Sequence, residues 1–412
     1  MIRHLLKLVW NRKRMNALII LEIFFSFLVV FVVSTLGLYL WDNVHRPLGF
    51  SYKDVLVASI NMQQTGDDTF DGSQVATFER VLAETKALPA VEAAAGVMIV
   101  PYSNGNSTGG WQFNGRPIQT DFNEVTQDFD KVMGLHLVQG RWFQKGDDTL
   151  SWEPVVVNAE LARKIYGTGD PIGKRFGDPS KDNMDPERRV VGVVDEFRKG
   201  GELSGPGNYM FTLRGGGIRL EAAGSGLPGG GKGRPPRNLV VKMRPGTPVE
   251  FEEQLAKRLQ AVAPTWSFEV KPLSQMRTSS FRLILTPLVA GGIVALFLML
   301  MVGLGLIGVL WQNLLQRTRE IGLRRAAGAS RSNVHSQVLM EQMILTSFGV
   351  LLGTVLVIQI PLLDLIGFIS PRIVLGGILV AMISIYLLAA LCAVQPSVMA
   401  SRVQPAEALR YE

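Results

Sequence analysis

The chain has 412 residues and a mean hydropathy of +0.21, a value that excludes an ordinary soluble protein. Charged residues make up 19 % of the sequence and are concentrated between about residues 42 and 282, so the composition predicts a membrane protein with one large water-soluble domain. The net charge of +7 requires no nucleic acid, because five basic residues lie among the first sixteen and five arginines lie in one central loop, where anionic lipid headgroups would attract them. The single cysteine, Cys392, excludes an intrachain disulfide, and the four scattered histidines show no metal-ligand spacing.

The first 41 residues predict a membrane anchor. Residues 1–16 place apolar side chains on one helical face and basic ones largely elsewhere, which is typical of a short interfacial helix on the cytoplasmic leaflet. Residues 17–41 are apolar, long enough to cross a bilayer, and followed by no small-residue cleavage site, so we expect an uncleaved first span. Glu22 lies about one turn into this span, where pairing with the nearby arginines or a subunit contact is favoured over a separate functional role.

Residues 42–281 have the pattern of an α+β domain. Runs rich in β-branched residues predict strands at 55–60, 95–100, 154–157, 189–194 and 239–243, and helical spacing predicts helices at 74–88, 160–166 and 249–262. The acidic pairs Asp67-Asp68 and Asp147-Asp148 lie in turn-like stretches and are expected to be solvated.

Residues 200–237 are so rich in glycine and proline that we expect a flexible insertion. They contain a string like the start of a phosphate-binding loop, from Gly226 to Lys232. Gly233 stands where Ser or Thr should hold Mg²⁺, and no strand precedes the string, so a nucleotide site is excluded there.

The C-terminal third predicts three more spans, at residues 282–310, 338–360 and 372–395. The loop at 311–337 and the tail at 396–412 carry arginines, whereas the turn at 361–371 has neither lysine nor arginine. The positive-inside rule therefore places both termini and the long loop in the cytoplasm. Glycines in the second span, including Gly303, Gly305 and Gly308, fit either packing within the chain or a dimer face.

The loop at 311–337 is the candidate docking element. It predicts a short basic helix, then a break at Gly328-Ala329 and a new helix capped by Ser330. Such a helix at the cytoplasmic ends of two spans could bind a soluble partner; the alternative is a solvated loop that owes its arginines to topology alone.

The string from Arg319 to Ala329 (REIGLRRAAGA) resembles the signature of the MacB/FtsX superfamily of ABC-transporter permeases, and the ending Gln404-Pro405-Ala406-Glu407-Ala408-Leu409-Arg410 resembles that family's C-terminus. Gly140-Arg141-Trp142-Phe143 and Val190-Val191-Gly192-Val193-Val194-Asp195 resemble its periplasmic core domain. The resemblance implies an α-helical membrane protein with four transmembrane helices and a large α+β extracytoplasmic domain inserted between helices 1 and 2, without a fused ATPase domain. It also implies a coupling helix that docks on the ATPase and includes Arg319, Glu320, Ile321, Gly322, Arg324, Arg325, Ala327, Gly328, Ala329 and Ser330.

The sequence contains no recognisable catalytic constellation, so transport energy would have to come from another polypeptide. The resemblance implies a mechanotransmitting, non-catalytic permease of the bacterial inner membrane that binds no cofactor or metal itself, with ATP and Mg²⁺ on a partner ABC ATPase. Its cargo would be a peptide, antibiotic or lipidic molecule. Further implied partners are a second permease copy or paralogue, a periplasmic adaptor protein and membrane lipid, but no nucleic acid.

Two other functions stay open at this point. The first is a lipoprotein-releasing or FtsX-like signalling permease that controls a protein outside the membrane, although FtsX-like members usually have a smaller outer domain. The second is a membrane-anchored binding or sensory module without an ATPase, which would leave the basic loop unexplained.

Overall fold

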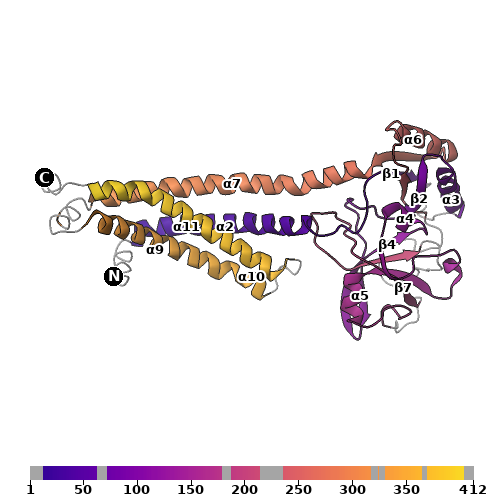
Figure 1. The fold of residues 1–412 in the computed structure, drawn as a ribbon, viewed down its shortest axis with the longest axis horizontal. Helices are drawn as coiled ribbons and strands as arrows, with labels where there is room; N and C mark the ends of the chain where they lie inside the picture. Colours follow the sequence, from indigo (N-terminus) through magenta and orange to yellow (C-terminus); the bar gives the residue numbers. More distant parts are fainter. Residues whose placement is uncertain are drawn as a thin grey trace. The chain divides into compact units, whose positions relative to one another are not determined.

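The computed structural model describes residues 13–62, 72–178, 187–213, 235–316, 323, 330–363 and 369–402. The chain forms two compact units (Figure 1). The membrane unit comprises Met1–Asp42 and Ile284–Glu412, and the inserted domain comprises Asn43–Leu283. Within the described residues, four helical segments are long and apolar enough to cross a membrane: Ala17–Val44, Leu273–Gln312, Ser332–Leu362 and Pro371–Val398. This confirms the fold class expected from the sequence, a four-span protein with an α+β domain between the first two spans.

The membrane unit is built from helix α2 (Lys13–Val44), most of α7 (Leu273–Gln316), α9 (Arg331–Val357), the short α10 (Gln359–Leu362) and α11 (Pro371–Arg402). Helix α10 includes Pro361 and Leu362, so the expected turn at 361–371 begins two residues later than predicted, and residues 364–368 lie outside the described part. The apolar faces of all four long helices meet in one buried cluster.

Glycines bring α2 close to its neighbours in the membrane unit. A Cβ atom added at Gly349 of α9 would lie 2.6 Å from Ile23 of α2, and one at Gly377 of α11 would lie 1.9 Å from the Thr35 hydroxyl. Small residues at such positions allow two helix backbones to approach closely. The glycines of the second span differ in their surroundings. A Cβ at Gly303 would lie 3.3 Å from Cys392 Sγ and one at Gly305 would lie 2.8 Å from Glu22 Oε2, as expected for packing within the chain, whereas a Cβ at Gly308 would have nothing within 4 Å. The arginines proposed to pair with Glu22 lie outside the described side chains.

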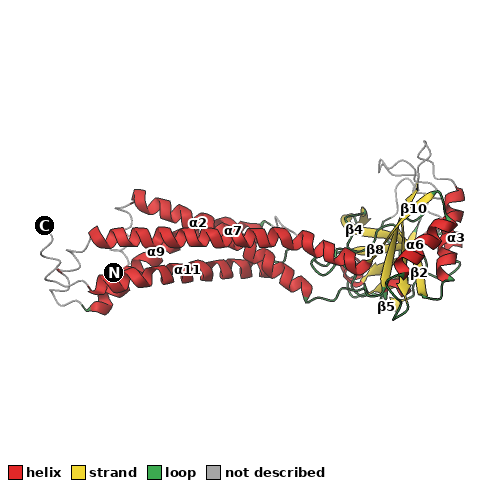
Figure 2. Cartoon of the chain, turned by 90° about the horizontal axis from the view of Figure 1, so that it is seen from above, coloured by secondary structure: helices red, strands yellow, loops and turns green. Residues whose placement is uncertain are grey.

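The inserted domain contains one mixed sheet (Figure 2), in which the described strands follow the order β10-β1-β9-β2-β4-β8-β6-β7-β5, with β3 paired to β4. Pairs β4–β8 and β6–β7 are parallel and the other pairs are antiparallel. The strands are β1 (Val55–Met62), β2 (Val91–Val97), β3 (Thr108–Phe113), β4 (Arg116–Val125), β5 (Leu137–Gly140), β6 (Glu153–Asn158), β7 (Arg188–Val194), β8 (Tyr209–Leu213), β9 (Asn238–Met243) and β10 (Trp266–Pro272).

Helices cover both faces of this sheet, since alternate residues of a strand point to opposite sides. On one face, α3 (Gly72–Lys86) and α6 (Phe251–Val262) pack on Leu56 and Ala58 of β1, and α5 (Ala159–Tyr166) packs on β6 and β7. On the other face, Val57 joins a core that contains α4 (Phe129–Met133) and a cluster of aromatic rings.

Most elements predicted from hydrophobic patterns are confirmed, with small shifts at their ends. The strand expected at 95–100 instead runs from Val91 to Val97.

The flexible insertion expected at 200–237 is wrong in its first part, because β8 is wholly buried and pairs with both β4 and β6. Tyr209 and Phe211 pack in the core on one face of the sheet and Met210 packs in the core on the other. This burial on both faces makes the segment a strand despite the glycines and prolines around it. Residues 214–234, which include the phosphate-loop-like string, lie outside the described part.

Candidate functional site

The predicted docking element lies mostly outside the described residues. Of its members, only Ser330 is described; the others are Arg319, Glu320, Ile321, Gly322, Arg324, Arg325, Ala327, Gly328 and Ala329. Ser330 has an extended backbone (φ −69°, ψ 157°), and its hydroxyl accepts a hydrogen bond from the Asn333 backbone N–H at 3.2 Å. This confirms the predicted N-cap of α9, because the side chain satisfies one of the free N–H groups at the helix start.

A second candidate lies inside the inserted domain, at the turn that follows β7. We call residues 198–204 the junction turn. Its first residue, Arg198, is 1 % exposed, and its guanidinium donates to five backbone carbonyls. The partners are the carbonyls of Asn43 (2.8 Å), Arg46 (3.2 Å), Pro47 (3.5 Å), Glu202 (2.7 Å) and Ser204 (3.0 Å from Nε). A guanidinium suits this position because it carries five donors in a fixed planar arrangement.

Arg198 holds the end of the first long helix. Asn43 lies in the last turn of α2, where backbone carbonyls lack partners within the helix and favour a nearby positive charge. The Asn43 side chain also donates to the Leu203 carbonyl at 3.3 Å. The helix end and the junction turn therefore each donate a hydrogen bond to the other. The segment after the helix passes close to the chain just beyond β7: Gly49 has a φ of +83°, and a Cβ there would lie 1.5 Å from the Glu196 carbonyl oxygen.

Glu202, in the same turn, holds the beginning of α7. Its carboxylate accepts hydrogen bonds from the Tyr102 hydroxyl at 2.9 Å and from Arg277 Nε at 2.6 Å. The Arg277 guanidinium also lies over the rings of Tyr52 and Phe281, at 4.7 and 4.5 Å from their centroids. Burial, and then the hydrogen bond to Glu202, raise the pKa of Tyr102, so this hydroxyl stays protonated and keeps donating.

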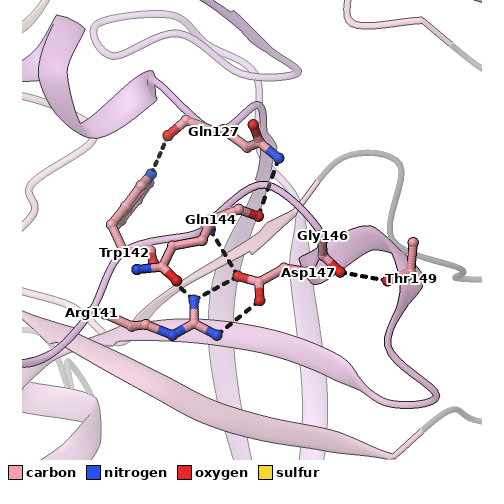
Figure 3. Close-up of polar contacts among 7 residues, drawn as sticks. All are labelled: Gln127, Arg141, Trp142, Gln144, Gly146, Asp147 and Thr149. Atoms are coloured by element: carbon pink, nitrogen blue, oxygen red, sulfur yellow. Dashed lines mark hydrogen bonds and ion pairs between the residues drawn. The ribbon is translucent and has the colours of Figure 1, made fainter.

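A second polar cluster stabilises the loop between β5 and β6 (Figure 3). Arg141 forms a two-pronged ion pair with Asp147, at 2.7 and 2.8 Å, and the Gln144 backbone N–H donates to the same carboxylate at 2.8 Å. Burial alone raises the pKa of Asp147, but the hydrogen bonds from Arg141 and the Gln144 N–H outweigh it and lower that pKa. The expectation of a solvated pair is therefore wrong for Asp147, which is 7 % exposed, whereas Asp148 is exposed. Asp67 and Asp68 lie outside the described residues.

The cluster in Figure 3 and the junction turn share one aromatic core. Trp142 donates its indole N–H to the Gln127 carbonyl at 2.7 Å, and its ring lies 5.4 Å from that of Phe211. Phe211 in turn lies 4.9 Å from Phe197, which immediately precedes Arg198. Edge-to-face contacts of this kind fix ring orientation, so both polar clusters are anchored to the same rigid interior.

These sites position backbone and helices, and their polar groups are used in structural contacts. Within the described residues, no group of three His, Cys, Asp or Glu side chains could hold a metal ion. Sequence reasoning missed Arg198 and Glu202 altogether. The only signal was their position three and seven residues after the string Val190-Val191-Gly192-Val193-Val194-Asp195, which resembles a family motif.

Family models agree with this architecture. The MacB-like periplasmic core domain matches residues 17–260, and the FtsX-like permease C-terminal region matches residues 292–405. The chain belongs to the MacB/FtsX-type family of ABC transporter permeases. The first match covers the first span and most of the inserted domain, and the second covers the later part of α7 together with α9 and α11.

Individual relatives are distant. The chain is 25 % identical over 293 residues to the macrolide export ATP-binding/permease protein MacB of Bordetella avium. The matched region covers 70 % of this chain and 42 % of that protein. It is 24 % identical over 290 residues to the pyoverdine export ATP-binding/permease protein PvdT of Pseudomonas syringae pv. syringae, covering 69 % and 42 %. The chain thus spans about two fifths of the length of these relatives. Among solved structures, the periplasmic region of MacB from Actinobacillus actinomycetemcomitans is similar with a TM-score of 0.38 and 14 % identity, covering 57 % of this chain and 96 % of that one.

Proposed function

We propose that this chain is the permease subunit of an inner-membrane ABC exporter and acts as a mechanotransmitter. In this role, ATP binding and hydrolysis by a separate cytoplasmic ATPase move the docking loop at residues 311–337, and the helices carry the movement to the inserted domain on the periplasmic side. The chain itself would bind neither ATP nor metal, and both termini would be cytoplasmic.

The observation that carries this proposal is the continuity of α7. The helix has 44 residues and runs from the end of β10 to Gln316, directly before the predicted docking residues. A bilayer needs only about 20 helical residues, whereas at 1.5 Å per residue α7 is roughly 66 Å long. One helix, with Pro287 inside it, therefore runs from the inserted domain through the membrane span to the start of the docking loop, and we infer that it transmits displacement along this path.

Export is favoured over signalling by the size of the inserted domain and by the relatives, whose names refer to macrolide and pyoverdine export. The cargo class follows only by analogy, so peptides, antibiotics and lipidic molecules are all substrates to test. Lipoprotein release is the second candidate, because it uses the same transmission from an ATPase to an outer domain.

The test is purification of the full chain from native membranes, with its bound proteins identified by mass spectrometry. An ABC ATPase should copurify in near-stoichiometric amount, and Gly328→Glu should abolish its binding, since a large charged side chain would displace the partner from a surface of small residues. Gly110→Glu is the matched control, because it makes the same change at an exposed position of the inserted domain, where an added Cβ meets no atom within 4 Å. Recovery of the chain without any ATPase would favour a membrane-anchored sensory module.

A further inference from the structure

Both helices that connect the inserted domain to the membrane contact the same short turn. The end of α2 reaches it through the Asn43 and Arg46 carbonyls, which accept from Arg198. The start of α7 reaches it through Arg277, which donates to Glu202. Arg198 and Glu202 are four residues apart and are themselves joined, since the Arg198 guanidinium donates to the Glu202 carbonyl at 2.7 Å. All of these residues belong to the inserted domain.

The junction turn is itself fixed to the sheet. Its backbone is closed by hydrogen bonds from the Gly201 N–H to the Arg198 carbonyl at 2.8 Å and from the Ser204 N–H to the Gly201 carbonyl at 3.1 Å. The Tyr102 N–H donates to the Lys199 carbonyl at 2.9 Å, which ties the turn to the segment after β2. Leu203 is 4 % exposed, so the far end of the turn is buried as well.

The turn also has little freedom to rearrange. Gly201 has a φ of +85°, and a Cβ there would lie 2.2 Å from the Tyr102 ring. The partners that Arg198 reaches are backbone carbonyls, so the side chain fixes the path of the main chain at several points at once. A lysine ammonium carries its three donors on one nitrogen and cannot reproduce that planar arrangement. Displacement of either helix end would therefore be passed to the sheet instead of being absorbed by the turn.

We propose that the junction turn is a clasp that joins the outer ends of α2 and α7 to each other and to the sheet, with Arg198 and Glu202 as its two positioning residues. Its use in transmission rests on the proposed function, whereas the clasp itself is a property of the chain alone. The alternative is that each helix end is anchored independently, and the two models differ in how a change at one end affects the other.

The experiment is hydrogen exchange, read by mass spectrometry, on the full chain in lipid nanodiscs without ATPase or nucleotide. In Arg198→Lys, loss of charge-assisted hydrogen bonds should speed exchange about tenfold in residues 43–50. Because the clasp is shared, exchange should also rise in residues 273–281, where Arg277 reaches the turn through Glu202. Glu202→Gln, a milder change, should raise exchange about threefold in 273–281 and measurably in 43–50.

Arg188→Lys is the matched control. Arg188 is also buried, at 9 % exposure, and its Nε donates to Glu153 at 2.8 Å, but it lies in β7 away from the turn. This variant should loosen β6 and β7 and leave residues 43–50 and 273–281 unchanged. If Arg198→Lys and Glu202→Gln each loosen only their own helix end, or if neither end changes, the clasp is wrong. Should Arg198→Lys fail to accumulate, Glu202→Gln decides the question by the same comparison.

A second arm separates this inference from the proposed function. With the ATPase bound, the parent chain should change its exchange in the inserted domain when ATP is added, and Arg198→Lys should bind the ATPase equally well but lose most of that response. A parent chain that shows no response contradicts mechanotransmission and leaves the nucleotide-free result on the clasp standing. A full response in Arg198→Lys contradicts the clasp as a transmitting element.

Discussion

Phe27 of α2 lies over Gly353 of α9 so closely that a Cβ atom at Gly353 would stand 2.3 Å from the ring. Phe27 is fully buried, and its ring sits among the apolar side chains that join the four long helices. The packing of the membrane unit therefore requires glycine at position 353, because any side chain there would collide with the Phe27 ring.

Gly353→Ala should destabilise the membrane unit by about 1–3 kcal/mol, since the added methyl group must push a buried ring out of place. The measurement is the thermal unfolding midpoint of the full chain in detergent, followed by tryptophan fluorescence. Gly308→Ala is the control: Gly308 lies within α7 with nothing within 4 Å, so alanine should be neutral or slightly stabilising there. Equal midpoints for both variants would show that α2 and α9 are not packed as described.

Asp147→Asn should lower the stability of the inserted domain at pH 7 by about 1–2 kcal/mol, because it removes the charged acceptor that Arg141 and the Gln144 N–H share. The folded state holds the pKa of Asp147 below the ordinary carboxyl value of about 3.9, so this contribution is complete above that pH and is lost as the pH falls through the lower folded value. The difference between variant and parent should therefore shrink as the pH is lowered below about 4.

The check is thermal unfolding of the inserted domain, measured in the full chain at several pH values between neutral and strongly acidic. Asp148→Asn changes an exposed neighbour and should match the parent throughout. A destabilisation by Asp147→Asn that is the same at every pH would mean that the carboxylate charge does not contribute.

The topology can be tested by labelling introduced cysteines in intact cells, in a chain whose Cys392 is replaced by serine. Ser151 is exposed in the inserted domain, and Ser332 is exposed in the first turn of α9. A membrane-impermeant maleimide should label Ser151→Cys and leave Ser332→Cys unlabelled until the membrane is permeabilised. Labelling of both sites in intact cells would contradict the proposed orientation.

How much could be predicted differed between local and long-range features. The four spans and strands such as β6 and β7 follow from runs of apolar and β-branched residues, which report on their own surroundings. Strand β8 was missed because its short run lies among glycines and prolines, and only its pairing with β4 and β6 makes it a strand. Arg198 could not be recognised, since its role depends on the carbonyl of Asn43, 155 residues earlier in the chain.

The candidate docking site shows the same division. Ser330 was predictable as an N-cap because capping depends on residues three positions away. The docking roles of the residues from Arg319 to Ala329 rest on the family resemblance and stay predictions. Gly140-Arg141-Trp142-Phe143 was recognised as a family string, but the ion pair that Arg141 makes with Asp147 depends on how the loop folds back and was not foreseen.

The central claim is that ATP used by a partner moves the inserted domain. The most direct measurement is hydrogen exchange on the complex of the full chain with its copurified ATPase in nanodiscs, comparing the nucleotide-free state with the state trapped by ATP and vanadate. The account predicts altered exchange within residues 43–283, beginning at the junction turn, together with changes in the loop at 311–337. Changes confined to the ATPase and that loop, with the inserted domain identical in both states, would contradict it.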